Sequence, residues 1–341
     1  MKKIAVEEHI SIQDYIDYLY TRKTPPRIEV LDDPRMGKIT RDWLTPEYYM
    51  DMPLVTGGDN RGDISGIHLR LEDMDKAGIN MQVLSMRNPG IEEFEIDEGI
   101  TWARRINNEL ARIVDTYPDR FAAFAMIPWQ DADAAVKELE RAVKELGLKG
   151  VKTQSHIKGE HLDKKKYWPI FQKAAELDVP VFIHPREPCA EMLKPYLAYP
   201  GLAGAGWGYQ AEVGLHAMLL IYSGLFDAFP KLKIILGHMG EGLPFWLFRM
   251  DGKGGTPGIK KKPSEYVKDN FFVATSGMFS QAALMCSYLA LGADNILFAV
   301  DYPPESNIEA AEFIDHAPIC PADREKICHL NAERLLKLRS P

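Results

Sequence analysis

The sequence predicts an α/β protein, and more specifically a (β/α)8 TIM barrel. Eight short apolar runs, each of strand length, are spread along the 341 residues, and helical stretches separate most of them. Such alternation is typical of parallel strands joined by right-handed crossovers, and eight is the number of strands that closes this barrel. A doubly wound open sheet is the alternative. No glycine-rich phosphate loop follows the first run, so we favour the barrel.

The predicted strands, in chain order, are 4–6, 79–86, 121–127, 148–153, 179–183, 232–237, 271–276 and 296–300. Their continuous apolar character suits strands that are buried on both faces. Helical periodicity predicts helices at 97–117, 133–146, 167–177 and 213–229, and a last helix that begins after Pro321 and runs to Leu338. In the second of these, one apolar face is formed by Ala135, Leu139, Val143 and Leu146.

The segment 11–66 is too long for an ordinary strand-to-helix loop, which spans about 2–6 residues. It has no clean period, yet it contains an apolar cluster made of Trp43, Tyr48, Tyr49, Met50 and Met52. The segment could be surface padding, a subunit contact or a cap over the barrel mouth. We favour the cap, because long insertions at this end usually shape the site. We therefore expect a single domain over residues 1–341, with 11–66 as a capping insertion.

Composition excludes several classes of function. Hydrophobic residues make up 46% and charged residues 26%, which suits a large core rather than a disordered chain. A formal net charge of −8 argues against a nucleic-acid partner. No apolar stretch reaches the roughly 20 residues of a membrane span, and the N-terminus lacks a signal-peptide pattern. The four cysteines form no CxxC pair, so we expect a cytoplasmic protein without disulfides and without a membrane partner.

Chemically versatile residues lie at the ends of four predicted strands. Glu7 and His9 come at the end of the first run, His184 after the fifth, His238 after the sixth and Asp301 after the eighth. In a barrel these ends converge on the carboxyl-terminal mouth, where active sites lie. Glu7 and His9 are two residues apart on an extended chain, so their side chains point to the same side. Two imidazoles and two carboxylates are a ligand set suited to Zn²⁺, Mn²⁺ or Fe²⁺.

Each of these residues also has a simpler interpretation. A single histidine is more often a hydrogen-bonded packing residue than a metal ligand, and Asp301 could cap a turn before Pro303. Four such residues at four strand ends are much less expected by chance, so we favour the metal site. Glu8, next to Glu7, is expected to face outward and to form an ordinary salt bridge.

Several segments resemble the aromatic decarboxylase branch of the amidohydrolase superfamily. That branch includes γ-resorcylate, 2,3-dihydroxybenzoate and 5-carboxyvanillate decarboxylases, and it is related to aminocarboxymuconate semialdehyde decarboxylase. The stretch GHMGEGLP is the most specific of the similar segments. The similar segments are 6–9, 182–185, 236–241 and 298–303, with further similarity at 71–79, 117–121 and 331–335.

The resemblance implies one divalent metal ion per chain, Zn²⁺ or Mn²⁺, and no organic cofactor. It implies that His238 is the acid/base residue and that the carboxylate of Glu241 orients it. Binuclear relatives carry a carboxylated lysine after strand four; Lys152 lies nearby, but we expect it to be a strand-end charge. The implied metal ligands are Glu7, His9, His184 and Asp301.

Substrate contacts are less well defined. After Asp251 the resorcylate decarboxylases typically continue with His-Arg-Asn, whereas this chain has a glycine-rich stretch, so the ring substitution stays open. In relatives this region approaches the site partly from a neighbouring subunit. Arg249 could bind a polar group of the substrate or pair with Asp251 or Glu241, and Arg61 is a candidate for binding the carboxylate. The resemblance also implies a homodimer or homotetramer.

The expected function is that of a carboxy-lyase, a metal-dependent non-oxidative decarboxylase of a hydroxybenzoate-type acid. An ortho hydroxyl makes the ring carbon basic enough to accept a proton before CO₂ leaves. Asp301 is the candidate donor, and His238 recharges it or steers the phenol; their order stays open. A metal-dependent hydrolase of a lactone or amide, with Asp301 as base, is the alternative. A catalytically inactive binding protein would be expected to have lost a ligand, and none is missing.

Overall fold

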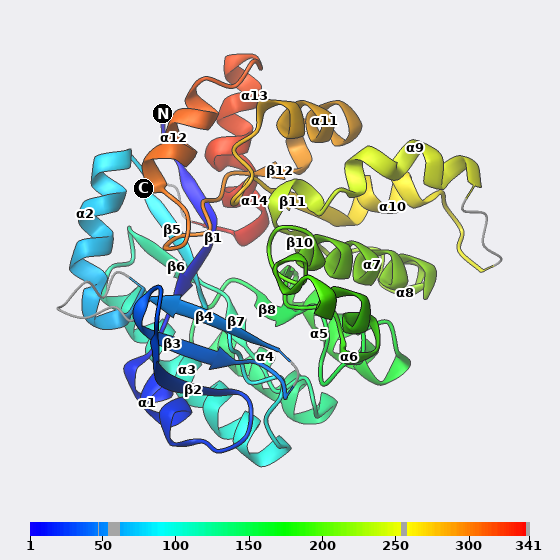
Figure 1. The fold of residues 1–341 in the computed structure, drawn as a ribbon. Helices are drawn as coiled ribbons and strands as arrows, with labels where there is room; N and C mark the ends of the chain where they lie inside the picture. Colours follow the sequence, from blue (N-terminus) through cyan, green and yellow to red (C-terminus); the bar gives the residue numbers. More distant parts are fainter. Residues whose placement is uncertain (47, 54–61, 254–257, 339–341) are drawn as a thin grey trace.

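The computed structural model describes residues 1–46, 48–53, 62–253 and 258–338, and it confirms the eight predicted strands (Figure 1). Phe124 alone separates β6 from β7, so these two short strands together form the third strand of the barrel. The strands are β1 (Ile4–Ile10), β5 (Met81–Met86), β6 (Phe121–Ala123) with β7 (Ala125–Met126), β8 (Val151–Gln154), β9 (Val181–His184), β10 (Ile234–Leu236), β11 (Phe271–Ala274) and β12 (Ile296–Leu297).

The strands pair in parallel and form a closed ring. One sheet runs β1-β5-β6 and the other β7-β8-β9-β10-β11-β12. The chain that follows β12 returns to β1, where the amide of Val6 donates to the carbonyl of Phe298 at 3.1 Å. The amide of Asp301 donates to the carbonyl of Glu7 at 2.9 Å. The (β/α)8 barrel predicted from the sequence is therefore the observed fold.

Helices cover the outside of the ring, and three predicted helices are confirmed as α3 (Ile96–Thr116), α4 (Ala132–Lys144) and α5 (Trp168–Leu177). The predicted helix at 213–229 is two helices, because Gly224 adopts a φ of 80° and interrupts it. A π-helical segment, Lys326–Leu330, lies within the predicted last helix. The other helices are α2 (Ile67–Ala77), α6 (Ala190–Leu193), α7 (Gly208–Tyr222), α8 (Leu225–Ala228), α9 (Leu243–Lys253), α10 (Pro263–Asn270), α11 (Gln281–Leu291), α12 (Asn307–Asp315), α13 (Pro321–Glu325) and α14 (Asn331–Leu336).

Two apolar layers fill the barrel. Outward-facing strand residues pack against the helices in a large cluster. Inward-facing residues form a second cluster, in which the rings of Phe124 and Phe182 lie 5.8 Å apart, centroid to centroid. These side chains fill the barrel interior, so polar groups at the carboxyl ends of the strands can line a mouth above them. No helix within the described ranges is long and apolar enough to cross a membrane.

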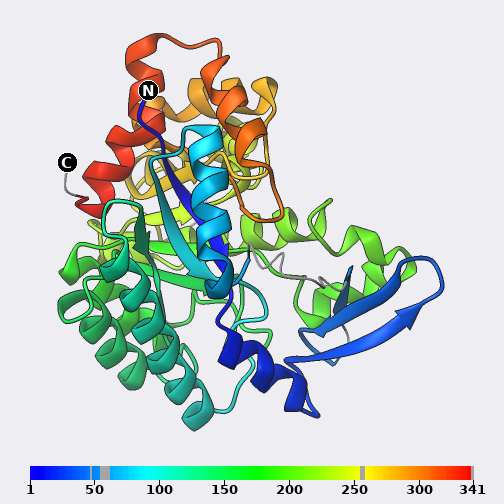
Figure 2. The ribbon, with the colours of Figure 1, turned by 90° about the vertical axis from the view of Figure 1, so that its left-hand side faces the viewer.

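The insertion after β1 is more regular than its sequence indicated. It begins with α1 (Gln13–Thr21) and continues as an antiparallel sheet of β2 (Arg27–Asp33), β3 (Gly37–Trp43) and β4 (Tyr49–Pro53). Only Ile28, Ile39 and Asp42 are buried on β2 and β3, which explains why no clear apolar period predicted these strands. Figure 2 shows the sheet standing beside the segment between β9 and α7.

Candidate active site

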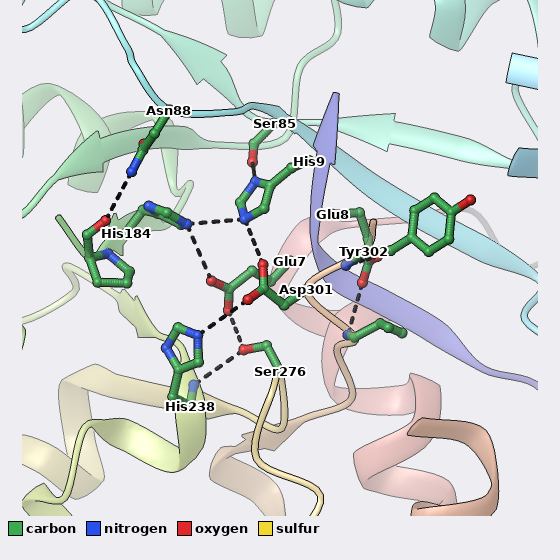
Figure 3. A network of polar contacts seen from close by, with 12 residues as sticks. Glu7, Glu8, His9, Ser85, Asn88, His184, His238, Ser276, Asp301 and Tyr302 are labelled. Atoms are coloured by element: carbon green, nitrogen blue, oxygen red, sulfur yellow. Dashed lines mark hydrogen bonds and ion pairs between the residues drawn. The ribbon is translucent and has the colours of Figure 1, made fainter. Parts of the chain in front are cut away.

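Four side chains singled out from the sequence meet at the mouth of the barrel. Glu7 and His9 lie on β1, His184 is the last residue of β9, and Asp301 follows β12. Each offers one ligand atom, and the four atoms lie within 4.8 Å of one another. Figure 3 shows the four side chains converging from β1, from the end of β9 and from the segment after β12. The structure thus brings together four residues that were grouped only because each lies at the end of a predicted strand.

A β-bulge explains why Glu7 and His9 reach this mouth. Val6 belongs to the cluster inside the barrel, so strict alternation would point Glu8 inward as well. The pairing of β1 with β5 changes register between Ala5 and Glu8, where β1 accommodates one extra residue. The bulge reverses the alternation and turns Glu7 and His9 toward the interior.

The two histidines face each other through their Nε2 atoms. Their Nε2 atoms lie 3.0 Å apart. Nδ1 of His184 lies 3.3 Å from the carbonyl oxygen of the Gln154 side chain, and Nδ1 of His9 lies 3.4 Å from the Ser85 hydroxyl. The Gln154 oxygen accepts a hydrogen bond from Nδ1 of His184, which leaves Nε2 of His184 without a proton. Outer hydrogen bonds of this kind orient metal-binding histidines.

Two carboxylates complete the set. Oδ1 of Asp301 lies 2.9 Å from Nε2 of His9, and Oε1 of Glu7 lies 3.9 Å from Nε2 of His184. Oε1 of Glu7 is buried and has no hydrogen-bond partner among the described residues. A divalent cation would bind this oxygen and both Nε2 nitrogens at once. Gly237 makes room for Glu7, because a Cβ there would lie 2.6 Å from Oε2 of Glu7.

The charge state of the buried ligands suits a cation. Burial lowers the pKa of His9 to about 4, and the positive charge of Lys152 acts in the same direction. Burial and Lys152 likewise hold the pKa of His184 well below its ordinary value. Burial raises the pKa of Glu7 to about 7, against an opposing attraction from His238. Both imidazoles are therefore neutral at neutral pH, which is the form that binds metals.

His238 faces this cluster from the turn after β10. Its Nε2 lies 3.6 Å from Oδ2 of Asp301, and its Nδ1 lies 2.8 Å from Oε1 of Glu241. Burial acts to lower the pKa of His238, but Glu241, Glu7 and Asp301 together raise it well above its ordinary value. Burial acts to raise the pKa of Asp301, but its hydrogen bonds with His238 and His9 lower it below the ordinary range. A proton shared by this pair therefore resides on His238.

The backbone around the site is unusual. His238, Met239, Glu241 and Asp301 all have positive φ, between 47° and 74°, although none is a glycine. Residues in this region cost free energy and persist where surrounding contacts determine them, which is common in active sites.

Two expectations about charged residues were wrong. Lys152 is not a strand-end charge; it is 1% exposed on β8 and donates to the carbonyl of Met86. Burial lowers its pKa to about 8. Glu8 points away from the barrel axis as expected, but it is fully buried and accepts backbone hydrogens from Val300 and Tyr302 in place of a salt bridge.

The substrate-binding candidates are not placed in the cluster. Arg61 lies outside the described residues. Arg249 is exposed on α9 and forms no ion pair within the described part of the chain. Asp251 instead accepts from Ser264, and Glu241 is engaged with His238, so neither pairing considered for Arg249 is observed.

Three polar residues at strand ends were missed. Ser276 follows β11, donates to Oε2 of Glu7 and accepts the amide hydrogen of His238 at 3.2 Å. Ser85 and Gln154, on β5 and β8, contact His9 and His184. All three lie at or near the ends of predicted strands. A search of these positions for neutral polar side chains, as well as for ionisable ones, would have found them.

A closed (β/α)8 barrel with two histidines and two carboxylates at its mouth defines a metal-dependent barrel enzyme. Residues 26–338 match the family model described as amidohydrolase. The chain belongs to the amidohydrolase family and, within it, to the aromatic decarboxylase branch.

Individual relatives agree with this membership. The γ-resorcylate decarboxylase of Rhizobium radiobacter is 39% identical over 322 residues, 89% of this chain and 98% of that protein. The crystal structure of 5-carboxyvanillate decarboxylase from Sphingomonas paucimobilis superposes with a TM-score of 0.86 at 35% identity, covering 99% of both chains. A dihydroxybenzoic acid decarboxylase from Polaromonas sp. JS666, solved with bound manganese and the inhibitor 2-nitroresorcinol, gives 0.81 at 34% identity, covering 99% of this chain and 98% of that one.

Proposed function

We propose that this protein is a metal-dependent, non-oxidative decarboxylase of a hydroxybenzoate-type acid with a hydroxyl ortho to the carboxylate. The observation that carries the proposal is the convergence of Glu7, His9, His184 and Asp301 within 4.8 Å, with His238 beside Asp301. The relatives named above, which decarboxylate hydroxylated benzoates according to their names, support the substrate class.

The chemistry requires an ortho hydroxyl. Direct loss of CO₂ from a benzoate would leave an unstable aryl anion. An ionised ortho phenol instead donates electrons to the carbon that bears the carboxylate, so that carbon can accept a proton. The carbon–carbon bond then breaks, its electron pair restores the aromatic ring, and CO₂ leaves. A divalent metal, when bound, lowers the pKa of the phenol and holds the phenolate and the carboxylate in place.

The protein residues supply and orient the proton. We assign Asp301 as the donor to the ring carbon, because it belongs to the cluster and also faces His238. At rest the proton resides on His238, and it passes to Asp301 across the 3.6 Å between Nε2 and Oδ2 before Asp301 delivers it to the ring. Glu241 fixes the orientation of His238 through its contact with Nδ1 at 2.8 Å. The reaction consumes one proton for each CO₂ released, and solvent replaces it.

We assign Glu7, His9, His184 and Asp301 as the ligands of one divalent ion, Mn²⁺ or Zn²⁺, per chain. The facing Nε2 atoms and the Oε1 of Glu7, which has no hydrogen-bond partner among the described residues, support this ligand set. The manganese bound by the Polaromonas relative supports Mn²⁺. We further propose a cytoplasmic location, which the four free cysteines suit.

We propose that the insertion closes one side of the mouth. Asp42 of β3 pairs with Arg87, which follows β5, at 2.7 Å, and the hydroxyl of Tyr209 donates to the sulfur of Met50 at 3.1 Å. Pro26 and Leu44 also line a small cavity together with Gln154, the partner of His184, and with Arg186. These contacts anchor the insertion to loops at the carboxyl ends of the strands.

We also propose a homodimer or homotetramer. Phe245, Trp246 and Phe248 are all exposed on α9, and Phe248 is 94% exposed. Clustered aromatic side chains of this kind mark interaction surfaces. Arg249 lies next to them, so it is our candidate for contacting substrate across the subunit interface. Light scattering on the purified protein tests the oligomeric state, and a monomer at micromolar concentration would refute this part of the proposal.

The activity is tested with a panel of 2-hydroxybenzoates by measuring CO₂ release, with the metal content determined on the same sample. We expect release from at least one compound. The same preparation is assayed with aryl lactones, and lactone hydrolysis without CO₂ release would favour the hydrolase alternative.

A further inference from the structure

The carboxylate of Glu8 binds the backbone on both sides of Asp301, the residue that we assign as proton donor. Its Oε1 accepts the amide hydrogen of Val300 at 2.9 Å, and its Oε2 accepts that of Tyr302 at 3.2 Å. Asp301 lies between these two amides in the chain. Figure 3 shows Glu8 on the opposite side of β1 from Glu7 and His9, with its carboxylate toward the chain on either side of Asp301.

Asp301 needs such support because its backbone is strained. Its φ is 74°, a conformation that side chains other than glycine rarely adopt. Its own amide donates to the carbonyl of Glu7 at 2.9 Å, and the carbonyl of Tyr302 accepts from the amide of His9 at 2.8 Å. Three consecutive residues of β1 therefore hold Asp301 and Tyr302. Among these three residues, Glu8 is the one whose side chain binds the backbone amides on both sides of Asp301.

The surroundings of Glu8 favour a side chain that accepts hydrogen bonds. Glu8 is fully buried, and a third donor, Nε2 of Gln82, lies 3.2 Å from Oε2. The guanidinium of Arg70, also fully buried, donates to Oε1 of Gln82 at 2.9 Å and stacks 4.6 Å from the ring centre of Tyr302. All three groups hydrogen-bonded to Glu8 are donors, and a carboxylate accepts from all of them.

We propose that Glu8 is a positioning residue that holds Asp301 in the backbone conformation required for metal binding and proton transfer. The proposal rests on the function assigned to Asp301 above. It predicts that Glu8 acts on the site through the amides of Val300 and Tyr302, although it contacts neither the metal ligands' side chains nor the substrate.

The test compares Glu8→Gln with a matched variant, Gln82→Met. Glutamine has the same shape as glutamate, but its NH₂ group cannot accept, so one of the two backbone amides loses its partner. Gln82→Met removes the third donor and leaves both backbone contacts intact. Folding of each metal-free variant is checked by circular dichroism and thermal unfolding. We then measure Mn²⁺ affinity by titration, hydrogen exchange of peptides covering 298–303 by mass spectrometry, and decarboxylation kinetics.

For Glu8→Gln we expect Mn²⁺ affinity to fall about tenfold and kcat at saturating Mn²⁺ to fall about tenfold, as for other partners of ligand residues. KM for substrate should change by less than a factor of two, and peptides over 298–303 should exchange faster. Gln82→Met should keep Mn²⁺ affinity and exchange within about twofold of the parent, since both backbone contacts of Glu8 persist.

Unchanged Mn²⁺ affinity and exchange in a folded Glu8→Gln would overturn the proposal, as would equal losses in Gln82→Met. If Glu8→Gln does not fold, Glu8→Asp replaces it, because its shorter side chain cannot reach both amides. Metal affinity and exchange do not depend on the reaction. They therefore test Glu8 even if the parent protein releases no CO₂, and that result would count against the proposed function alone.

Discussion

The Nε2 atoms of His9 and His184 face each other at 3.0 Å, and Nδ1 of His184 is directed to the Gln154 side chain. Burial keeps both imidazoles neutral, which is the form that binds metals. The buried Oε1 of Glu7 beside them has no hydrogen-bond partner among the described residues. A divalent cation at this position would satisfy that oxygen and both nitrogens.

Metal binding should therefore stabilise the fold and depend on His184. We expect about one divalent ion per chain, and removal of the ion by a chelator should lower Tm; Mn²⁺ at 100 times its Kd adds about 2.7 kcal/mol. His184→Ala should lose the ion. His316→Ala, at an exposed residue following α12, is the control and should retain it. Two ions per chain by elemental analysis, or full retention in His184→Ala, would contradict the ligand assignment.

Ser276 should tune the same site. Its hydroxyl donates to Glu7 and accepts the amide hydrogen of His238, so it links a proposed ligand to the proposed acid/base residue. Ser276→Ala leaves both groups without this partner and should lower kcat by about tenfold, with weaker metal binding. Ser287→Ala is the matched control, since Ser287 is also buried and donates to the carbonyl of Met239. Steady-state kinetics and metal titration measure both variants, and equal effects in the two would show that Ser276 has no special role.

The pH dependence of stability should report two buried histidines away from the metal ligands. Burial lowers the pKa of His216 to about 3 and that of His156 to about 2. An unfolded histidine binds a proton near pH 6.5, so below that pH the unfolded state binds more protons. Stability of the metal-free protein should thus fall as pH decreases from about 6.5 toward 4 and be fully present above about 6.5.

The variant His216→Gln isolates one of these contributions. Glutamine can still accept the amide hydrogen of Leu162, which Nε2 of His216 accepts at 3.2 Å, but it does not titrate. Urea unfolding at pH 7 and pH 5 should show that the variant loses about 2 kcal/mol less than the parent between these values. His316→Gln is the control, at an exposed position. A parent protein whose stability is equal at both pH values would refute the prediction.

Much of the site could be predicted because strand ends converge in a barrel regardless of local detail. Glu7, His184 and Asp301 needed only the strand assignment. Glu8 was misjudged because its partners are the backbone amides of Val300 and Tyr302, 292 and 294 positions away, which the sequence of β1 does not indicate. Lys152 was misjudged because a buried lysine is rare, and its partner is a backbone carbonyl 66 positions away.

The sheet of the insertion was missed for a different reason. Strands β2 and β3 pair in antiparallel register from Arg27 opposite Trp43 to Asp33 opposite Gly37, yet most of their side chains are partly or fully exposed. A sheet that buries little apolar surface leaves no strong period-two pattern in its sequence. Its stability then depends on cross-strand contacts such as the hydrogen bond from Trp43 to Glu29, at 2.8 Å.

The last prediction concerns the mechanism. An ortho hydroxyl should be required, so at least one 2-hydroxybenzoate should lose CO₂, whereas its methyl ether and a benzoate hydroxylated only at the meta position should not. Turnover in heavy water should place one deuterium on the carbon that lost CO₂, and NMR of the product measures it. A product without deuterium, or a meta-only compound that reacts as fast as the ortho one, would exclude ring protonation.

Two variants separate the roles of the proton-transfer pair. Asp301→Asn should nearly abolish turnover, because it removes the proposed donor together with a charged ligand. His238→Asn should slow turnover by about 10²- to 10⁴-fold, the usual contribution of a general acid or base, while most of the metal is retained. The two variants should differ in metal retention because the two residues are placed differently. Oδ1 of Asp301 lies 2.9 Å from Nε2 of His9, a proposed ligand, whereas Nε2 of His238 lies 3.6 Å from Oδ2 of Asp301. Elemental analysis and steady-state kinetics on the same samples decide it; loss of metal in His238→Asn equal to that in Asp301→Asn would place His238 among the ligands instead.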